Sequence, residues 1–516
     1  MTDNLLLDPL IRVRRNGTTQ ALSLPEVLAA LAADEVDDFP ALRPHQRHPW
    51  HAFLCQLAVM AAEEGGEDRL DLSPGRWREL LRRLTPGFPE DEPWRLCVAD
   101  LSRPAFLQPP VPEGTLNDFT GMGKLDKTSA LSLDVLVCAN AHGEKAKTDI
   151  RGHLEQWIFG LFIVQTFSGQ LGAPNYGIAR QNGGFAARPG VSLTFSSRFG
   201  PRWRRDCSVL LAEKERLRIP QVYPPAGGER LLWLLRWTGG KNESLPLSRL
   251  HPLCIETARR LRLVRMANGR LRCHAKGTAA RRIAAEAYRG AVGDPWIPTD
   301  LTDKTPKALN RKPHYTTAHA VLFDRKLYTP ALLQEYRPDE PKEGAAVLFR
   351  IFQRTQGGSD GYHERAIPVP ATCVGFLSTR TEDAAQTARN MAELARAARN
   401  RVLKPALLQL MQAGREQIEF QQPETNDWAS RLARKLDKDI DASFFPILWT
   451  CLERLDADEE AEDPVPWREY LIEAVRRHFA AGAEGLPLHS GLRYRARATA
   501  ENMLEGAIRK HLSIQE

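Results

Sequence analysis

The segment EDAAQTARNMAELARAARNRVLKPALLQLMQAG, residues 382–414, decides how the chain divides. Its apolar residues Met391, Leu394, Ala398 and Val402 recur every three or four positions, which is the spacing of one face of an α-helix. Arginines fill the positions between them. The spacing predicts an amphipathic helix that buries one side against other helices.

Three further segments after this one have the same helical character, at residues 425–456, 466–482 and 489–513. Short polar links join them, as in antiparallel helical bundles. We therefore predict a C-terminal four-helix bundle over residues 379–516.

The chain before residue 378 has a mixed pattern. Short strand-like runs are separated by connections rich in proline and glycine, and these runs are VSLTF (191–195), LLWLLRW (231–237), AAVLFRIF (345–352) and VGFLS (374–378). Helices are expected at residues 50–63, 75–84 and 150–170. The fold class is therefore predicted as α+β, with a large mixed α/β N-terminal domain over residues 1–378 followed by the bundle.

The first residues carry clear local signals. Residues 4–13 and 18–24 flank a turn at Arg15, Asn16 and Gly17, which predicts a hairpin. Ser23 and Glu26 then form a capping-box pattern, which predicts a helix through Ala32.

Composition favours a folded protein of the cytoplasm. Of the 516 residues, 71 are Lys or Arg and 64 are Asp or Glu, giving a net charge of +7. Because this excess is small, only its distribution can indicate a polyanionic partner. The eight cysteines lack a disulfide framework and are expected to be reduced, and no run approaches the length of a membrane span.

Two motifs suggest enzymes. Gly357, Ser359 and Gly361 match G-x-S-x-G, the nucleophile elbow of α/β-hydrolases, but Pro368 and Pro370 follow where the elbow needs a helix. The hydrolase therefore stays an alternative to a polar loop. GMGKLDK (121–127) lacks both the earlier glycine and the hydroxyl residue of a phosphate-binding loop.

A zinc site is a further alternative. His251, Cys254, Cys273 and His274 supply suitable ligand types. The adjacency of the last two makes one tetrahedral centre difficult, so two buried thiols and two polar histidines are the preferred interpretation.

Two segments suggest nucleic acid. GAPNYGIARQNGGFAARPG (172–190) combines glycines with arginines, and residues 259–282 hold nine Lys or Arg and no Asp or Glu. The latter, with Asn268 and Gly269 at its turn, is interpreted either as a solvated face or as a hairpin that follows phosphates. Arginines of the helical bundle suggest a second basic surface, and these are Arg476, Arg477, Arg493, Arg495 and Arg497.

The order of motifs resembles the CasA family, the large subunits of the type I-E CRISPR surveillance complex Cascade. The resemblance rests on NLLLDPLIRV (4–13), SLPEVL (23–28), RPAFLQ (103–108), a glycine-rich loop introduced by Ala-Pro, and the terminal helical bundle.

The resemblance implies a subunit without catalysis or cofactor. It implies binding of target double-stranded DNA, reading of the flanking motif (PAM) by minor-groove loops, and strand separation that starts an R-loop. The implied partners are guide CRISPR RNA, the other Cascade subunits and a recruited helicase-nuclease, with no membrane.

The resemblance also implies site residues. The loop that reads the PAM maps onto Asn175, Tyr176, Gly177, Ile178, Arg180, Gln181, Asn182, Gly183 and Gly184, where Asn175 and Ile178 replace family glycines. A basic finger maps onto Lys276, Arg281 and Arg282. The strand-separating wedge maps onto Thr355, Gln356, Gly357 and Gly358, and the segment that meets guide RNA onto Lys124 and Lys127.

Two other functions remain open at this point. One is a serine hydrolase that uses Ser359. The other is a free-standing nucleic-acid-binding protein that acts outside any complex.

Overall fold

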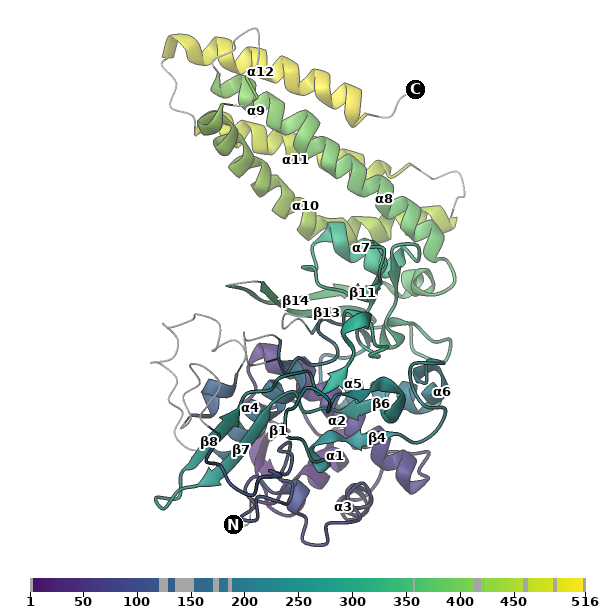
Figure 1. Cartoon of the computed structure of the whole chain (residues 1–516). Coiled ribbons are helices and arrows are strands. Elements are labelled where there is room, and N and C mark those ends of the chain that lie inside the picture. Colours follow the sequence, from purple (N-terminus) through teal and green to yellow (C-terminus); the bar gives the residue numbers. More distant parts are fainter. Residues whose placement is uncertain are drawn as a thin grey trace. The chain divides into compact units, whose positions relative to one another are not determined.

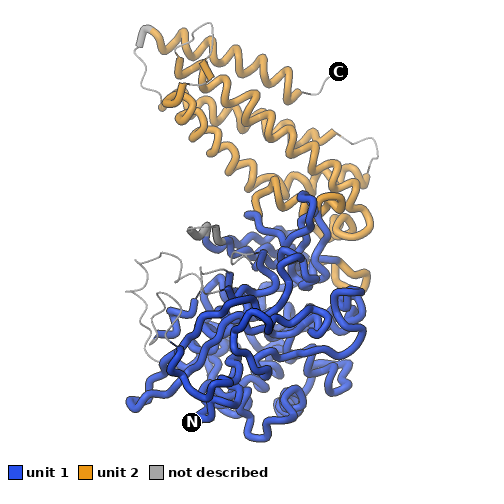
Figure 2. Tube along the Cα trace, viewed as in Figure 1, with its two compact units in different colours: residues 1–312, 328–335, 344–368 blue, residues 313–327, 336–343, 369–516 orange. Residues whose placement is uncertain are grey.

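The structure is a computed structural model of the whole chain. It describes residues 3–119, 129–134, 153–169, 176–183, 188–355, 358–412, 419–420, 422–457, 463–485 and 490–513. The chain forms two compact units (Figure 2). Unit 1 comprises residues 1–312, 328–335 and 344–368, and unit 2 comprises residues 313–327, 336–343 and 369–516.

The N-terminal hairpin and first helix form as predicted. β1 (Ile11–Arg15) pairs antiparallel with β2 (Thr18–Leu22). Asn16 and Gly17 have φ angles of 48° and 77°, which a two-residue hairpin turn requires and which these residue types tolerate. Ser23 and Glu26 form the capping box that opens α1 (Leu24–Ala32).

α2 (Pro44–Gly65) is the central helix of unit 1 and is buried on nearly every side from His45 to Ala62. The ring of Trp50 lies 5.0 Å from Phe159 and 5.9 Å from Phe162, both on α4 (Leu154–Phe167). Rings at these separations contribute beyond the apolar area that they bury. The predicted helices at 50–63 and 150–170 therefore form the core.

Two other helices complete the main helical layer of unit 1. They are α3 (Pro74–Arg83) and α5 (Phe199–Ala212). Figure 1 labels both helices.

The main sheet of unit 1 has the order β14-β13-β3 and is antiparallel. Its strands are β3 (Gly190–Thr194), β13 (Ala346–Thr355) and β14 (Gly358–Pro368). A separate hairpin joins β7 (Arg260–Arg265) to β8 (Leu271–Lys276), as the Asn268–Gly269 turn predicted, and extends beyond its neighbours in Figure 1.

Short elements connect these parts of unit 1. They are α6 (Lys214–Leu217), β4 (Glu229–Leu231), β5 (Leu245–Pro246), β6 (Leu250–Ile255), β9 (Ile283–Ala284), β10 (Thr299–Asp300), β11 (Lys307–Ala308) and β12 (Tyr328–Thr329).

Two predicted strands are wrong. Leu232–Leu234 and Ala371–Leu377 form 3-10 turns, within the runs LLWLLRW and VGFLS respectively. Both turns contain buried apolar side chains, and a short apolar run does not by itself distinguish a strand from a tight helical turn. The strands predicted at VSLTF and AAVLFRIF are confirmed.

Unit 2 is helical in its described part. Its helices are α7 (Tyr315–Phe323), α8 (Thr381–Ala397), α9 (Lys404–Met411), α10 (Pro423–Ala457), α11 (Val465–Glu484) and α12 (Ser490–His511). A π-helical turn, Ala398–Leu403, links α8 to α9, so the opening segment of the sequence analysis is continuously helical from 382 to 411. The α+β class is confirmed.

No helix of the described residues is both long and apolar enough to cross a membrane. Segments 313–327 and 336–343 belong to unit 2 although they precede the predicted boundary at residues 378 and 379.

Candidate nucleic-acid interface

The described part of the glycine-rich loop, residues 176–183, is held against the end of α4. The Asn182 side chain donates to the carbonyl oxygens of Phe167 and Ser168, each at 3.0 Å. The Ala179 backbone amide also donates to the Ser168 carbonyl. Since the last carbonyls of a helix lack intrahelical partners, Asn182 caps α4 while it fixes the loop.

The side chain of Arg180 also holds this loop in place. Its side chain is buried, and its guanidinium donates to the carbonyls of Pro252 and Cys254 at 3.2 and 3.0 Å. It also lies 3.5 Å from the Glu256 carboxylate. Burial raises the pKa of Glu256, although the nearby Arg180 charge acts in the opposite direction.

Gly177 is required by packing. A Cβ atom at this position would lie 1.8 Å from the backbone oxygen of Ala258. Ile178 beside it is 5% exposed, whereas Tyr176 is 38% exposed. Of the described loop, Tyr176 and Gly183 reach the surface, and the side chains of Ile178, Arg180, Gln181 and Asn182 are buried.

The burial of these four side chains does not fit the expectation that they contact DNA directly. All four are buried, and the side chains of Arg180 and Asn182 donate hydrogen bonds to backbone carbonyls of the protein. The physical reason is that the side chain of a polar residue in a glycine-rich loop can point either into the protein or into solvent. The local sequence does not specify which of the two occurs.

Most cations of the basic segment 259–282 are also buried or paired within the protein. Arg262 is buried and donates to the backbone carbonyls of Val98, Asp100 and Arg103 at 3.0–3.2 Å. Arg259 is buried as well and donates to the carbonyl of Gly169.

Acidic residues distant in sequence compensate other cations of this segment. Glu113 lies 2.9 Å from Arg260 and 3.0 Å from Lys276. Although burial opposes the effect, these two cations lower the pKa of Glu113 to about 2. Arg265 pairs with Asp3. The segment itself holds no Asp or Glu, and its counter-charges come from other parts of the chain.

The predicted basic finger follows the same pattern. Arg282 is buried, donates to the carbonyls of Arg236 and Glu243, and lies 5.3 Å from the Trp237 ring. Arg281 lies 3.1 Å from Glu286. Lys276 and Arg281 therefore bind a DNA phosphate only if each first breaks its ion pair with an acidic residue.

The predicted wedge lies at the end of the β13–β14 hairpin. Thr355 of β13 pairs with Gly358 of β14, and a bulge interrupts the register between Gln353 and Arg354. β13 is the middle strand of its sheet, so hydrogen bonds hold the base of the hairpin on both sides.

Six of the predicted site residues lie outside the described residues. They are Lys124, Lys127, Asn175, Gly184, Gln356 and Gly357.

Solved structures share this architecture over the whole chain. CasA of Thermus thermophilus has a TM-score of 0.63 and 15% identity, with 99% of this chain and 100% of that chain covered. Cse1 of Thermobifida fusca has a TM-score of 0.62 and 14% identity, covering 99% and 98%. The CRISPR-associated protein Cse1 of Acidimicrobium ferrooxidans has a TM-score of 0.58 and 15% identity, covering 99% of each chain.

The chain has the CasA fold. The resemblance found in the sequence is thereby confirmed for the fold. No family model and no curated protein sequence matches the chain.

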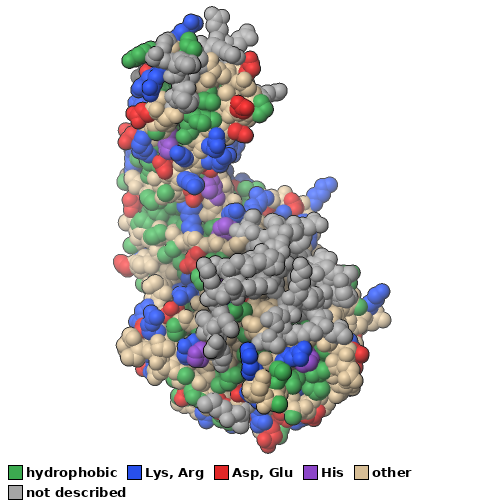
Figure 3. Space-filling model, turned by 90° about the vertical axis from the view of Figure 1, so that its left-hand side faces the viewer, with side chains coloured by type: hydrophobic (Ala, Val, Ile, Leu, Met, Phe, Trp, Pro, Cys, Tyr) green, Lys and Arg blue, Asp and Glu red, His purple; other side chains and the backbone are tan. Residues whose placement is uncertain are grey.

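Within the CasA fold of this chain, the described site candidates all lie in unit 1. The surface charge is mixed: on the face in Figure 3, basic and acidic side chains of described residues are interspersed. In unit 2, Arg476, Arg477 and Arg497 pair with Glu505, Asp439 and Glu501. Tyr494 of α12 is 84% exposed, with Arg493 and Arg495 exposed on either side of it in sequence.

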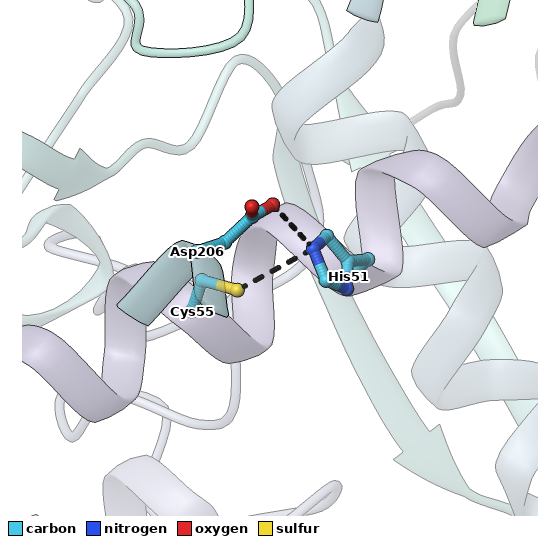
Figure 4. A group of neighbouring side chains, drawn as sticks. All are labelled: His51, Cys55 and Asp206. Carbon is cyan, nitrogen blue, oxygen red and sulfur yellow. Dashed lines mark hydrogen bonds and ion pairs between the residues drawn. The ribbon is translucent and has the colours of Figure 1, made fainter. Parts of the chain in front are cut away.

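Among the described residues, the four ligands considered for zinc do not form a group of metal ligands. Cys254 contacts the buried Arg180, and His251 lies 2.9 Å from Glu63. Within the described residues, three other potential metal ligands lie close together, and these are His51, Cys55 and Asp206 (Figure 4). Cys254 and Cys273 are buried free thiols, as the preferred interpretation had it.

Ser359 lies in β14 opposite Arg354. The strand continues to Pro368, so the backbone does not make the strand–turn–helix of a nucleophile elbow.

Sequence reasoning missed a buried residue that holds the backbone at Arg259, next to the Ala258 oxygen that Gly177 approaches. Gln165 of α4 accepts from the Arg259 amide at 2.7 Å and donates to the carbonyls of Leu107 and Arg259. A polar residue within the apolar run IFGLFIVQTF was the available signal, since a buried amide needs partners on neighbouring segments.

Proposed function

We propose that the chain is the large, DNA-binding subunit of an RNA-guided type I-E CRISPR Cascade. The observation that carries this proposal is the full-length similarity in fold to CasA and Cse1, the latter described as a CRISPR-associated protein. In this role the chain acts in the cytoplasm together with guide RNA and the other Cascade subunits.

The proposed first step is capture of duplex DNA through the flanking motif. Tyr176 is the exposed side chain of the described loop, and Gly177, Arg180 and Asn182 fix the backbone behind it. A contact that is preorganised in this way loses little conformational entropy on binding. Tyr176 and its neighbour Asn175 then read the minor groove.

The proposed second step is strand separation at the β13–β14 hairpin. Gln356 and Gly357 connect Thr355 to Gly358, so a polar amide follows the last paired residue of β13. An amide can occupy the space of a displaced base pair and hydrogen-bond to the base edges that this exposes. The guide RNA then tests the target by pairing.

The remaining contacts belong to the same proposal. Lys124 and Lys127 meet the guide RNA. The helices of unit 2 bind the displaced strand and help to recruit the helicase-nuclease, with Tyr494 as the exposed aromatic on which a base stacks.

The test is a reconstituted complex that carries Tyr176→Ala or Gln356→Ala. Tyr176→Ala should weaken capture of DNA with the preferred flank and leave binding to a random flank unchanged. Gln356→Ala should slow strand opening, followed with a fluorescent base analogue, and leave capture intact. Leu327→Ala is the matched control, because Leu327 is 40% exposed and lies outside the proposed contact segments.

If both variants capture and open DNA as the wild type does, the two assignments are wrong. Purification without guide RNA or sister subunits, with full activity on DNA, would instead support a free-standing DNA-binding protein. Labelling of Ser359 by a fluorophosphonate would support the hydrolase alternative.

A further inference from the structure

Two buried ion pairs connect the glycine-rich segment 172–190 to the rest of unit 1. Arg180 lies 3.5 Å from the Glu256 carboxylate, and Arg188 lies 3.9 Å from the Asp294 carboxylate. All four side chains are at most 2% exposed. Both cations belong to the glycine-rich segment, whereas both acids come from segments that are distant in sequence.

Glu256 contacts the backbone of the loop as well as the Arg180 side chain. Its Oε2 atom accepts a hydrogen bond from the Arg180 amide at 2.9 Å. Close to Glu256 in sequence is Ala258, whose carbonyl oxygen leaves no room for a Cβ atom at Gly177. The segment that carries Glu256 therefore contacts the loop both at Gly177 and at Arg180.

Asp294 belongs to a second segment that packs against the loop. A Cβ atom at Gly290, which has a φ angle of 86°, would lie 2.5 Å from the carbonyl oxygen of Gln181. The Oδ1 atom of Asp294 accepts from the Trp296 amide at 3.0 Å, which fixes the carboxylate. The other carboxylate oxygen is the one that faces Arg188.

These ion pairs are costly for folding. Oε1 of Glu256, Oδ2 of Asp294 and Nε of Arg180 have no hydrogen-bond partner among the described residues. The attraction within a buried ion pair offsets the loss of hydration only when hydrogen bonds satisfy the remaining polar atoms. Well-packed apolar residues of similar volume are often at least as stabilising in such positions. Stability alone therefore does not account for the four buried charges.

We propose that Glu256 and Asp294 are positioning residues that hold the glycine-rich loop in the conformation that reads the flanking motif. Glu256 acts through the amide and the guanidinium of Arg180, and Asp294 acts through Arg188. A loop that is held in this way loses less conformational entropy when it binds DNA. The inference rests on the proposed function of the loop.

The test measures binding of the reconstituted complex to DNA with the preferred flank and with a random flank. Glu256→Gln keeps an oxygen that accepts from the Arg180 amide but removes the charge. We expect it to lower the preference for the correct flank by about tenfold, because ordering two or more loop side chains on binding costs about that much affinity. Asp294→Asn keeps the acceptor for the Trp296 amide and should lower the preference by about threefold. Binding to the random flank should not change in either variant.

Denaturant unfolding separates positioning from stability. Glu256→Gln leaves Arg180 buried without its counter-ion and should destabilise the chain, whereas the double variant Arg180→Met/Glu256→Gln removes both charges and should recover stability. The double variant should still lack the flank preference.

Glu155→Gln is the matched control for the loss of a buried carboxylate. Glu155 is buried, pairs with Arg12 and accepts from the Arg12 amide at 3.0 Å, so it repeats the contacts of Glu256 away from the loop. This variant should keep the wild-type flank preference.

A double variant that recovers the flank preference together with its stability would overturn the inference, and so would an equal loss of preference in Glu155→Gln. Asp294→Asn decides the matter if the Glu256 variants fail to fold, since a wild-type preference in Asp294→Asn would also overturn it. A wild-type complex that does not distinguish the flanks would instead overturn the proposed function of the loop, and the inference with it.

Discussion

Gly177 fixes where the glycine-rich loop can lie. A side chain there would meet the backbone of Ala258, which cannot rotate away as a flexible side chain can. We expect Gly177→Ala to displace the loop, to lower the free energy of unfolding by about 1–3 kcal/mol, and to weaken capture of target DNA. Denaturant unfolding and DNA titration of the complex would measure both effects.

Gly87→Ala is the matched control, because a Cβ atom at Gly87 has no neighbour within 4 Å. Equal behaviour of the two alanine variants would mean that the loop does not rely on its contact with Ala258.

His319 of α7 gives unit 2 a pH dependence. Burial lowers the pKa of His319 to about 4; the Asp324 charge opposes this shift and the Arg389 charge adds to it. In the unfolded chain His319 binds a proton below about pH 6.5, its ordinary pKa, whereas in the folded chain it stays neutral down to about pH 4. Stability is therefore lost as the pH falls from about 6.5 to about 4. We expect a loss of about 2 kcal/mol between about pH 7 and about pH 5.

The measurement is urea unfolding at these two pH values for the wild type and for His319→Leu. The variant should lose that much less stability on acidification. The same loss in both proteins would assign the pH dependence to other groups.

At the scale of elements, local signals in the sequence predicted structure well where a residue type or spacing favours one local conformation. The Asn16–Gly17 turn, the Ser23–Glu26 capping box and the helical spacing after residue 382 are examples. The 3-10 turns in LLWLLRW and VGFLS were not predictable, because burial of an apolar run suits either backbone form.

The candidate site was less predictable than the fold. The loop and the hairpins were found, but the side on which their polar residues lie depends on distant partners. Arg180 is buried because backbone carbonyls of β6 accept hydrogen bonds from its guanidinium, and Lys276 is paired because Glu113 lies beside it. Neither partner is near in sequence.

The exposed start of α12 supplies a prediction for unit 2. Tyr494 is 84% exposed beside Arg493 and Arg495, so Tyr494→Ala should leave the free energy of unfolding unchanged. If a base of the displaced strand stacks on this ring, the variant should weaken single-stranded DNA binding by about 1–3 kcal/mol, or roughly 5 to 150-fold. Filter binding of the complex would measure it.

Leu492→Ala is the control for an exposed apolar neighbour, since Leu492 is 49% exposed. Unchanged affinity in Tyr494→Ala would place the displaced strand elsewhere.

For the whole molecule, the buried and paired arginines of segment 259–282 predict that the affinity for DNA depends only weakly on salt concentration. Each phosphate contact on duplex DNA contributes about 0.9 to the slope of log K against log salt. The isolated chain should therefore give a slope of less than about 4, far below the roughly 8 that nine free cations would produce. Fluorescence anisotropy at a series of salt concentrations tests this, and a slope near that larger value would mean that the hairpin cations leave their acidic partners.

The remote counter-charges of the β7–β8 hairpin bear on how the protein should be dissected. A fragment that spans residues 250–290 would lose Asp3 and Glu113, and with them the compensation of Arg265, Arg260 and Lys276. Such a peptide would adhere to any polyanion. Deletion mapping would then create the very activity that it was meant to locate, whereas single substitutions in the intact chain would not.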